Sequence, residues 1–140
     1  MPIQILISDG LVTKSAAQRM HADIAQLFLD THEISDNRFM LPNIIGEVVF
    51  IAKDLSFAGK QCQQVAVVEL RVPSFTFSTQ EQKDRFVRDA TEIVYQASDG
   101  KLSKRQIWVN AVYAVDGPWG IEGKAYSNAE LGQAIQEAAH

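Results

Sequence analysis

Residues 2–20 read PIQILISDGLVTKSAAQRM, and this stretch decides the fold. In its first seven residues the apolar side chains alternate, so that Ile3, Ile5 and Ile7 face one way, which is typical of a strand with one buried face. The DG pair that follows ends the strand, and Thr13 is a suitable N-cap for a helix. A strand that leads within a few residues into a helix predicts an α/β protein.

The first helix is expected from Lys14 to about Thr31, because apolar residues recur there at helical spacing. A polar connection follows, and then a less regular segment that Pro42 interrupts. The apolar run GEVVFIA at 46–52 predicts the next strand. The first part of the chain therefore reads strand, helix, strand.

The second half repeats this order. VAVVELRV at 65–72 predicts a strand, Thr79 and Gln82 form a capping box at the start of a helix, and QIWVNAVYAV at 106–115 predicts the closing strand. Thr13 precedes Thr79 by 66 residues, and the same interval separates the apolar positions of the two helices. The chain is therefore interpreted as a tandem repeat.

Parallel strands joined by a helix form right-handed βαβ units, so two such units predict one four-stranded sheet with both helices on one face. The chain, 1–140, is expected to be a single domain with βαβ repeats at about 2–60 and 62–125 and a C-terminal tail. Ser127 or Asn128 is expected to cap a short helix in that tail.

The second face of the predicted sheet has no helix to cover it. Leu6, Val65 and Val67 are apolar and point to that face. We therefore expect this face to be buried against another subunit.

The composition excludes several classes of function. A net charge of −4 with no basic run argues against nucleic acid and anionic membranes as partners. No apolar stretch is long enough for a bilayer span, and no secretory signal opens the chain. The single cysteine, Cys62, cannot form an internal disulfide and fits a reducing compartment, so a cytoplasmic location is expected.

No metal or cofactor is expected. The three histidines, His21, His32 and His140, have no partner at metal-ligand spacing. No glycine-rich loop opens a helix after a strand, as nucleotide sites require.

Two segments carry a family resemblance. PIQILISDG at the amino terminus and PWGIEGKAYS at 118–127, with Trp119 in the aromatic position, resemble the tautomerase superfamily. These two segments are similar to the 4-oxalocrotonate tautomerase branch, and the two-unit length is most similar to the malonate semialdehyde decarboxylase-like group. The segments GEVVFIAKDLSFAGKQCQQVAVVEL and STQEQK also resemble the layout of that group. The resemblance implies a tautomerase/MIF-like fold, a homotrimer, and an active site around Pro2 near a subunit boundary, walled in part by PWG.

Pro2 is the candidate catalytic residue. Once Met1 is removed, its secondary amine is a base, and burial in an apolar pocket lowers the pKa of such an amine below that of a free terminus. A neutral amine can move a proton next to a carbonyl, whereas a charged one acts as an acid or an anchor. The alternative is a proline that simply begins an edge strand.

A carboxylate substrate needs a cation, for which arginine is the better bidentate group. The arginine that the family places after the first strand's glycine is Leu11 here, and the stretch FTFS replaces an Arg-Pro-Arg run before the second helix. Arg71 is the first substitute candidate, and a pair with Glu69 is its alternative role. Arg38 is the second. Asp36 stands near a position that is acidic in the decarboxylase-like group and is a candidate acid or base.

Three further residues are candidates for substrate binding. Trp108 and Asn110 share one face of the closing strand and resemble an aromatic-x-Asn motif that lines the pocket from a neighbouring subunit in relatives; their alternative is a core tryptophan and a strand-edge amide. Trp119, between Pro118 and a glycine, is a candidate pocket wall, with a turn residue as its alternative. Glu122 replaces a glycine of the family pattern, and either alters the turn or points into the pocket.

The sequence therefore predicts a keto-enol tautomerase for a small 2-oxo or enol carboxylic acid, with Pro2 as general base. The alternatives are a decarboxylase or hydratase of the same superfamily, which the missing arginines disfavour, and a non-catalytic trimer that binds another protein.

Overall fold

A computed structural model of the chain describes residues 1–139. Two strand–helix–strand units form its centre: β1 (Pro2–Ser8), α1 (Lys14–Thr31) and β2 (Ile45–Ile51), then β5 (Ala66–Pro73), α3 (Gln80–Ala97) and β6 (Ile107–Ala114). Shorter elements connect and follow them: α2 (Met40–Asn43), the 3-10 helices η1 (Lys53–Leu55) and η2 (Lys104–Gln106), β3 (Phe57–Ala58), β4 (Gln61–Cys62), β7 (Trp119–Ile121), β8 (Lys124–Tyr126) and α4 (Asn128–Glu137).

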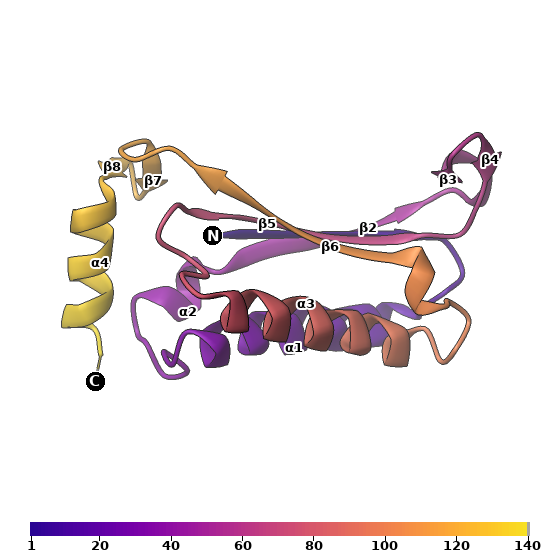
Figure 1. Cartoon of the computed structure of the whole chain (residues 1–140), viewed down its shortest axis with the longest axis horizontal. Coiled ribbons are helices and arrows are strands. Elements are labelled where there is room, and N and C mark those ends of the chain that lie inside the picture. The colour runs from indigo at the N-terminus through magenta and orange to yellow at the C-terminus, as the bar shows by residue number, and fades with distance from the viewer. Residues whose placement is uncertain (140) are drawn as a thin grey trace.

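The four long strands form one mixed sheet in the order β2-β1-β5-β6. β1 is parallel to β2, β5 is parallel to β6, and the central pair β1 and β5 is antiparallel. α1 and α3 lie side by side on one face of the sheet (Figure 1). The predicted α/β architecture, a four-stranded sheet with two helices on one face, is confirmed.

Local sequence explains where the helices begin. The Thr13 side chain accepts a hydrogen bond from the Ala16 N–H at 3.0 Å, and Thr79 forms a complete capping box with Gln82. Such caps satisfy N–H groups that a helix leaves unpaired at its start. Ser127, not Asn128, caps the terminal helix.

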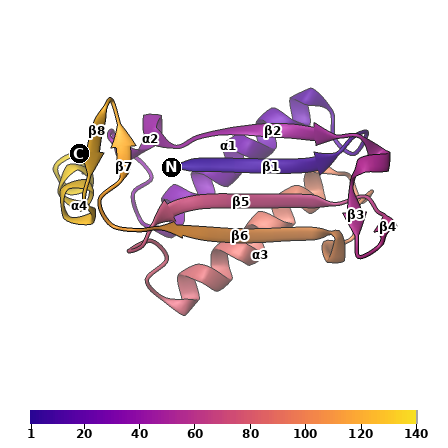
Figure 2. The same cartoon turned by 90° about the horizontal axis from the view of Figure 1, so that it is seen from above.

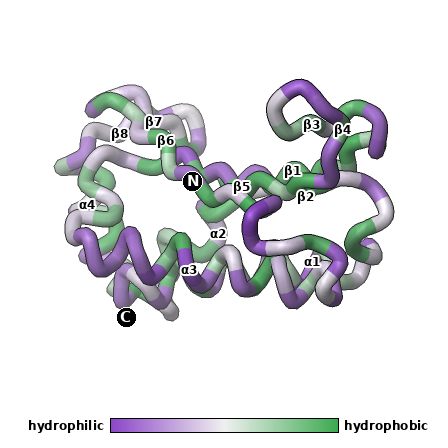
Figure 3. Tube along the Cα trace, turned by 45° about the vertical axis from the view of Figure 1, so that its right-hand side comes forward, coloured by the Kyte–Doolittle hydropathy of each residue, from purple (hydrophilic) through white to green (hydrophobic). Residues whose placement is uncertain are grey.

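The core lies between the sheet and the two helices. Ile3, Ile5 and Ile7 are fully buried, as the alternation in β1 predicts. They belong to one apolar cluster with residues from β5, α1 and α3, among them Met20, Ile24, Phe28, Val68, Leu70, Val72, Phe86, Ala90 and Val94. Hydrophobic residues dominate the central strands along the trace (Figure 3).

The opposite face of the sheet is largely open, as expected. Large apolar side chains on it remain exposed, namely Ile45, Val49, Trp108 and Val112. Val65 differs from expectation because it is buried: the segment with η1, β3 and β4 folds over this end of the sheet, and Ser8 pairs with Val65. β3–β4 and β7–β8 stand at opposite ends of the sheet, on the side away from α1 and α3 (Figure 1).

None of the helices in residues 1–139 combines the length and the hydropathy that crossing a membrane requires.

Candidate active site

A pocket of about 500 Å³ lies at the end of the sheet where β1 begins. Its walls come from the amino terminus, from the ends of β5 and β6, and from the β7 strand that follows them. The lining residues are Met1, Pro2, Asn43, Ile45, Arg71, Ala114, Pro118, Trp119, Gly120, Ile121 and Glu122.

Strand register brings Pro2 and Arg71 together. Ile3 pairs with Leu70 in the antiparallel ladder, so the preceding residue of β1, Pro2, comes opposite Arg71. Directly opposite residues of two strands have Cβ atoms about 5 Å apart on the same face. The candidate base and the candidate carboxylate anchor are therefore neighbours on the open face.

The Arg71 guanidinium remains available to a ligand. Its Nε lies 3.8 Å from Glu69 Oε1, and its side chain is 65% exposed. An exposed ion pair of this length is worth at most about 1 kcal/mol. The predicted alternative role, pairing with Glu69, thus coexists with a place in the pocket wall.

Trp119 reaches the pocket from the hairpin β7–β8. Trp119 pairs with Tyr126 in that hairpin, and the turn residues Glu122 and Gly123 both have positive φ, 52° and 81°. Two positive φ values in a two-residue loop match the right-handed twist of the strands. Asp116 accepts a hydrogen bond from the Asn128 N–H at 2.7 Å and so ties the base of the hairpin to α4.

The amino terminus lies in a dehydrated environment. Met1 is buried, and its amino group donates a hydrogen bond to the Asn43 carbonyl. Burial lowers the pKa of this amino group from 8.0 to about 6. The same desolvation is what a catalytic Pro2 amine needs, although the Pro2 nitrogen is an amide while Met1 is attached.

The other predicted site residues lie elsewhere in the chain. Trp108 is exposed on the open face opposite Val67, toward the far end of β6 from the pocket. Asn110 pairs with Glu69 and lines a different, smaller cavity against α3. Any role of Trp108 and Asn110 in a neighbouring subunit's site stays a prediction.

Arg38 and Asp36 lie in the connection between α1 and α2. Asp36 lines a surface hollow that also contains Ile135 of α4, and neither residue lines the Pro2 pocket of its own chain. The predicted roles, substrate binding for Arg38 and acid or base for Asp36, also stay predictions.

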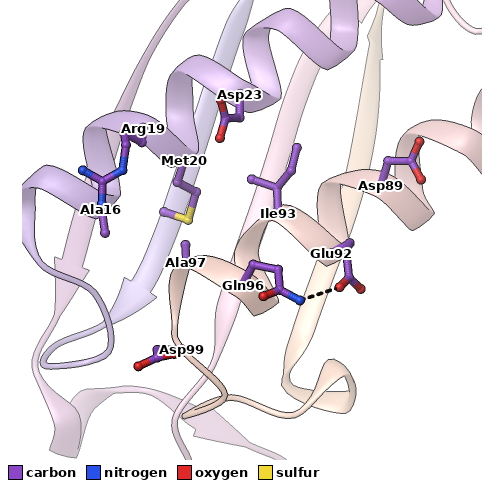
Figure 4. A pocket seen from close by; sticks show the side chains of 10 residues that line it. All are labelled: Ala16, Arg19, Met20, Asp23, Asp89, Glu92, Ile93, Gln96, Ala97 and Asp99. Atoms are coloured by element: carbon purple, nitrogen blue, oxygen red, sulfur yellow. Dashed lines mark hydrogen bonds between the residues drawn. The ribbon is translucent and has the colours of Figure 1, made fainter.

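A larger cavity, of about 680 Å³, lies between α1 and α3 on the outer side of the helices. Figure 4 shows four carboxylates around it, Asp23, Asp89, Glu92 and Asp99, with Arg19 as the one basic side chain. Glu92 is already bound to Lys104 and Asp89 to Arg88. An acidic wall repels a carboxylate substrate, so the Pro2 pocket is the better candidate.

No group of three or more His, Cys, Asp or Glu side chains within residues 1–139 is arranged to hold a metal ion. His32 has a structural role instead, because its Nδ1 donates to the Phe28 carbonyl and its Nε2 accepts the Phe77 N–H. Sequence reasoning left Glu122 open between a turn residue and a pocket residue; it has the positive φ of a turn residue, and it is among the residues that line the pocket.

No family model and no curated protein matches the chain. Solved structures do match. A fused 4-OT, the Q0 wild-type symmetric trimer, has a TM-score of 0.76 at 13% identity over 94% of this chain and 99% of that one. The FG41 malonate semialdehyde decarboxylase inhibited by 3-bromopropiolate has a TM-score of 0.65 at 11% identity, covering 86% and 88%.

A macrophage migration inhibitory factor-like protein from Entamoeba histolytica also matches, with a TM-score of 0.69 at 11% identity over 89% of this chain and 97% of that one. Identities this low establish the fold alone. The chain has the tautomerase superfamily fold, and the resemblance inferred from its two terminal segments is confirmed at that level.

Proposed function

We propose that the chain is a keto-enol tautomerase for a small 2-oxo or enol carboxylic acid. One observation carries the proposal: the β1–β5 register sets Pro2 beside Arg71 at a pocket walled by Trp119. Base, cation and apolar wall are the three parts that this chemistry requires.

The proposed reaction moves one proton. After removal of Met1, the Pro2 amine takes the proton of the enol hydroxyl, the carbonyl forms as the double bond shifts, and the ammonium returns a proton to the adjacent carbon. Arg71 holds the carboxylate, and burial against Trp119 and Ile121 keeps the amine neutral at pH 7.

We also propose a homotrimer. The open face carries exposed Ile45, Val49 and Trp108, and burying such side chains is favourable by about 25 cal/mol per Å². A fused 4-OT of similar fold is described as a symmetric trimer.

The test is enol-to-keto conversion of phenylenolpyruvate and 2-hydroxymuconate, with intact mass confirming the amino terminus. Pro2→Ala is expected to lower kcat about 10²–10⁴-fold, because the positioned base is lost. Arg71→Gln is expected to raise KM about 10-fold or more through the lost charge-assisted bond. Pro42→Ala, in α2 and outside the pocket lining, is the matched control.

A second candidate is a non-catalytic trimer that binds another protein. The observation that favours it is the packing of Met1 into the core, with its amine bonded to Asn43. A mass that retains Met1, together with inactivity on both substrates, supports this candidate. Substitution of Lys60, Lys101 or Arg105 is then expected to weaken partner binding, while Pro2→Ala does not.

A superfamily decarboxylase or hydratase remains the alternative chemistry. Activity on malonate semialdehyde that depends on Pro2, with neither enol converted, would identify it.

A further inference from the structure

The Pro2 pocket contains two charged side chains of opposite sign. Arg71 comes from β5 and Glu122 from the turn of the β7–β8 hairpin, and the other lining side chains carry no charge. The terminal amine is the one further group there that can become charged. The pocket lining thus contains one basic and one acidic side chain.

The hairpin sets the backbone position of Glu122, an exposed residue that lines the pocket. Ile121 pairs with Lys124, which closes the hairpin around Glu122 and Gly123. The hairpin lies beyond the amino-terminal end of β1 (Figure 2), and Pro2 and Glu122 line the same pocket. A substrate that reacts at Pro2 and extends past Trp119 therefore approaches Glu122.

The Glu122 charge is not cancelled within the chain. None of the ion pairs among residues 1–139 includes Glu122, and Lys124, two residues later, is paired with Glu130 at 3.4 Å. Glu69 also lies beside Arg71 and reduces its positive field. The pocket can therefore neutralise one carboxylate but not two.

We propose that Glu122 makes the site selective for monocarboxylates with an uncharged, mostly apolar remainder, and against dicarboxylates. This inference rests on the proposed function for its reactive substrates. One carboxylate binds Arg71, the apolar part contacts Trp119 and Ile121, and a second carboxylate meets the like charge of Glu122. Like charges about 4 Å apart repel by about 1 kcal/mol in water and more at a partly buried site.

The kinetic test compares two substrates that differ in their number of carboxylates. The wild type is expected to have a kcat/KM at least about 10-fold higher for phenylenolpyruvate than for 2-hydroxymuconate. Glu122→Gln is expected to raise kcat/KM for 2-hydroxymuconate about 5–10-fold and to change that for phenylenolpyruvate less than about twofold. Glu81→Gln, at the exposed start of α3, makes the same change in net charge outside the pocket and is expected to leave the ratio unaltered.

A binding measurement separates this inference from the catalytic proposal. Phenylacetate and adipate are unreactive mono- and dicarboxylates, and their affinities are measured by tryptophan fluorescence with wild type, Glu122→Gln and Pro2→Ala. Preference for phenylacetate that Glu122→Gln reduces and Pro2→Ala leaves intact supports the inference, even in a protein without tautomerase activity. Equal affinity for both ligands, or a preference that Glu122→Gln does not change, overturns the inference. Neither result bears on the proposed tautomerase activity, which is tested by the enol-to-keto assay.

Discussion

The two ends of the sheet are built alike and differ in chemistry. At each end a parallel edge strand leads into a small hairpin, β6 into β7–β8 and β2, through η1, into β3–β4 (Figure 2). Because β1 and β5 are antiparallel, each end of the sheet holds the start of one of these strands beside the end of the other. Pro2 beside Arg71 at one end therefore corresponds to Val65 beside Ser8 at the other. One end is a pocket, and the other is filled.

Hydrogen bonds close the Ser8 end. Ser8 Oγ accepts the Val65 N–H at 2.9 Å and donates to Ser56 Oγ at 2.8 Å, and Ser56 in turn donates to the Gln63 carbonyl at 2.8 Å. Ser8, Ser56 and Val65 are all buried. Each polar group there has a partner within the chain, so none is left for a ligand.

The difference follows from chain connectivity. Val65 continues from Gln64, so its nitrogen is an amide that can only donate a hydrogen bond. Pro2 is one residue from the chain terminus, and losing Met1 turns its nitrogen into an amine. Under the proposed function, which includes the removal of Met1, only the Pro2 end carries a reactive amine, and predictions can test each end separately.

The largest effect on stability is expected from Gly46→Ala at the pocket end. A Cβ at Gly46 would lie 2.2 Å from the Ile3 carbonyl oxygen and 2.3 Å from His21 Nε2. At the other end, the residue of β6 that takes the corresponding place beside β5 is Ile107, which is large and buried. Only the pocket end therefore requires a residue without a side chain at this place. We expect the free energy of unfolding to fall by about 3 kcal/mol, the upper range for overpacking.

Urea unfolding measures this loss. Gly132→Ala in α4 is the matched control, because a Cβ added at Gly132 would have no atom within 4 Å and helix propensity favours alanine by about 0.5–1 kcal/mol. A Gly46→Ala protein as stable as the wild type would contradict the close contact of β2 with α1.

A smaller effect is expected from Ser8→Ala at the closed end. The substitution leaves the buried Val65 N–H without its side-chain acceptor, which costs about 1–3 kcal/mol. Tautomerase kcat/KM is expected to stay within about twofold, because Ser8 lies at the end of β1 away from Pro2. Ser15→Ala, at an exposed serine of α1, is the control; a loss of activity with unchanged stability in Ser8→Ala would mean that the two ends are not independent.

Local signals in the sequence predicted most of the fold. The bounds of α1 match because Thr13 and the apolar spacing act within a few residues of each other. The alternation in β1 likewise identified its buried face. The burial of Val65 was not predictable, because it depends on a segment that folds back over the sheet from outside the repeat.

The candidate site was predictable only in part. Pro2 and Trp119 were found because terminal and turn motifs are local. Arg71 could be assigned to a strand face, but its place beside Pro2 depends on the β1–β5 register, which no local pattern states. Glu122 carries only the weak signal of an acidic residue before a turn glycine.

The smallest expected effect is a pH dependence at the pocket end. The helix C-caps of the two halves are His32 and Ser98. In the first half His32 Nε2 accepts a hydrogen bond from the Phe77 N–H at 3.2 Å, and in the second half Ser98 Oγ accepts one from the Leu102 N–H. Of these two capping side chains, only histidine titrates near neutral pH. Burial lowers the pKa of His32, and the hydrogen bond to the Phe28 carbonyl offsets this only in part.

The sign of the effect follows from the lowered pKa. As the pH falls below about 6.5, His32 takes up a proton in the unfolded chain before it does so in the folded one, so stability decreases until the folded-state pKa is passed. His32→Gln removes this contribution while His21 and the Ser98 cap remain. Urea midpoints between pH 5 and pH 8 are therefore expected to fall more steeply toward acid in the wild type than in His32→Gln. If the urea midpoints of the two proteins change in parallel with pH, then folding does not lower the affinity of His32 for a proton. The two helix ends would then respond to pH alike despite their different caps.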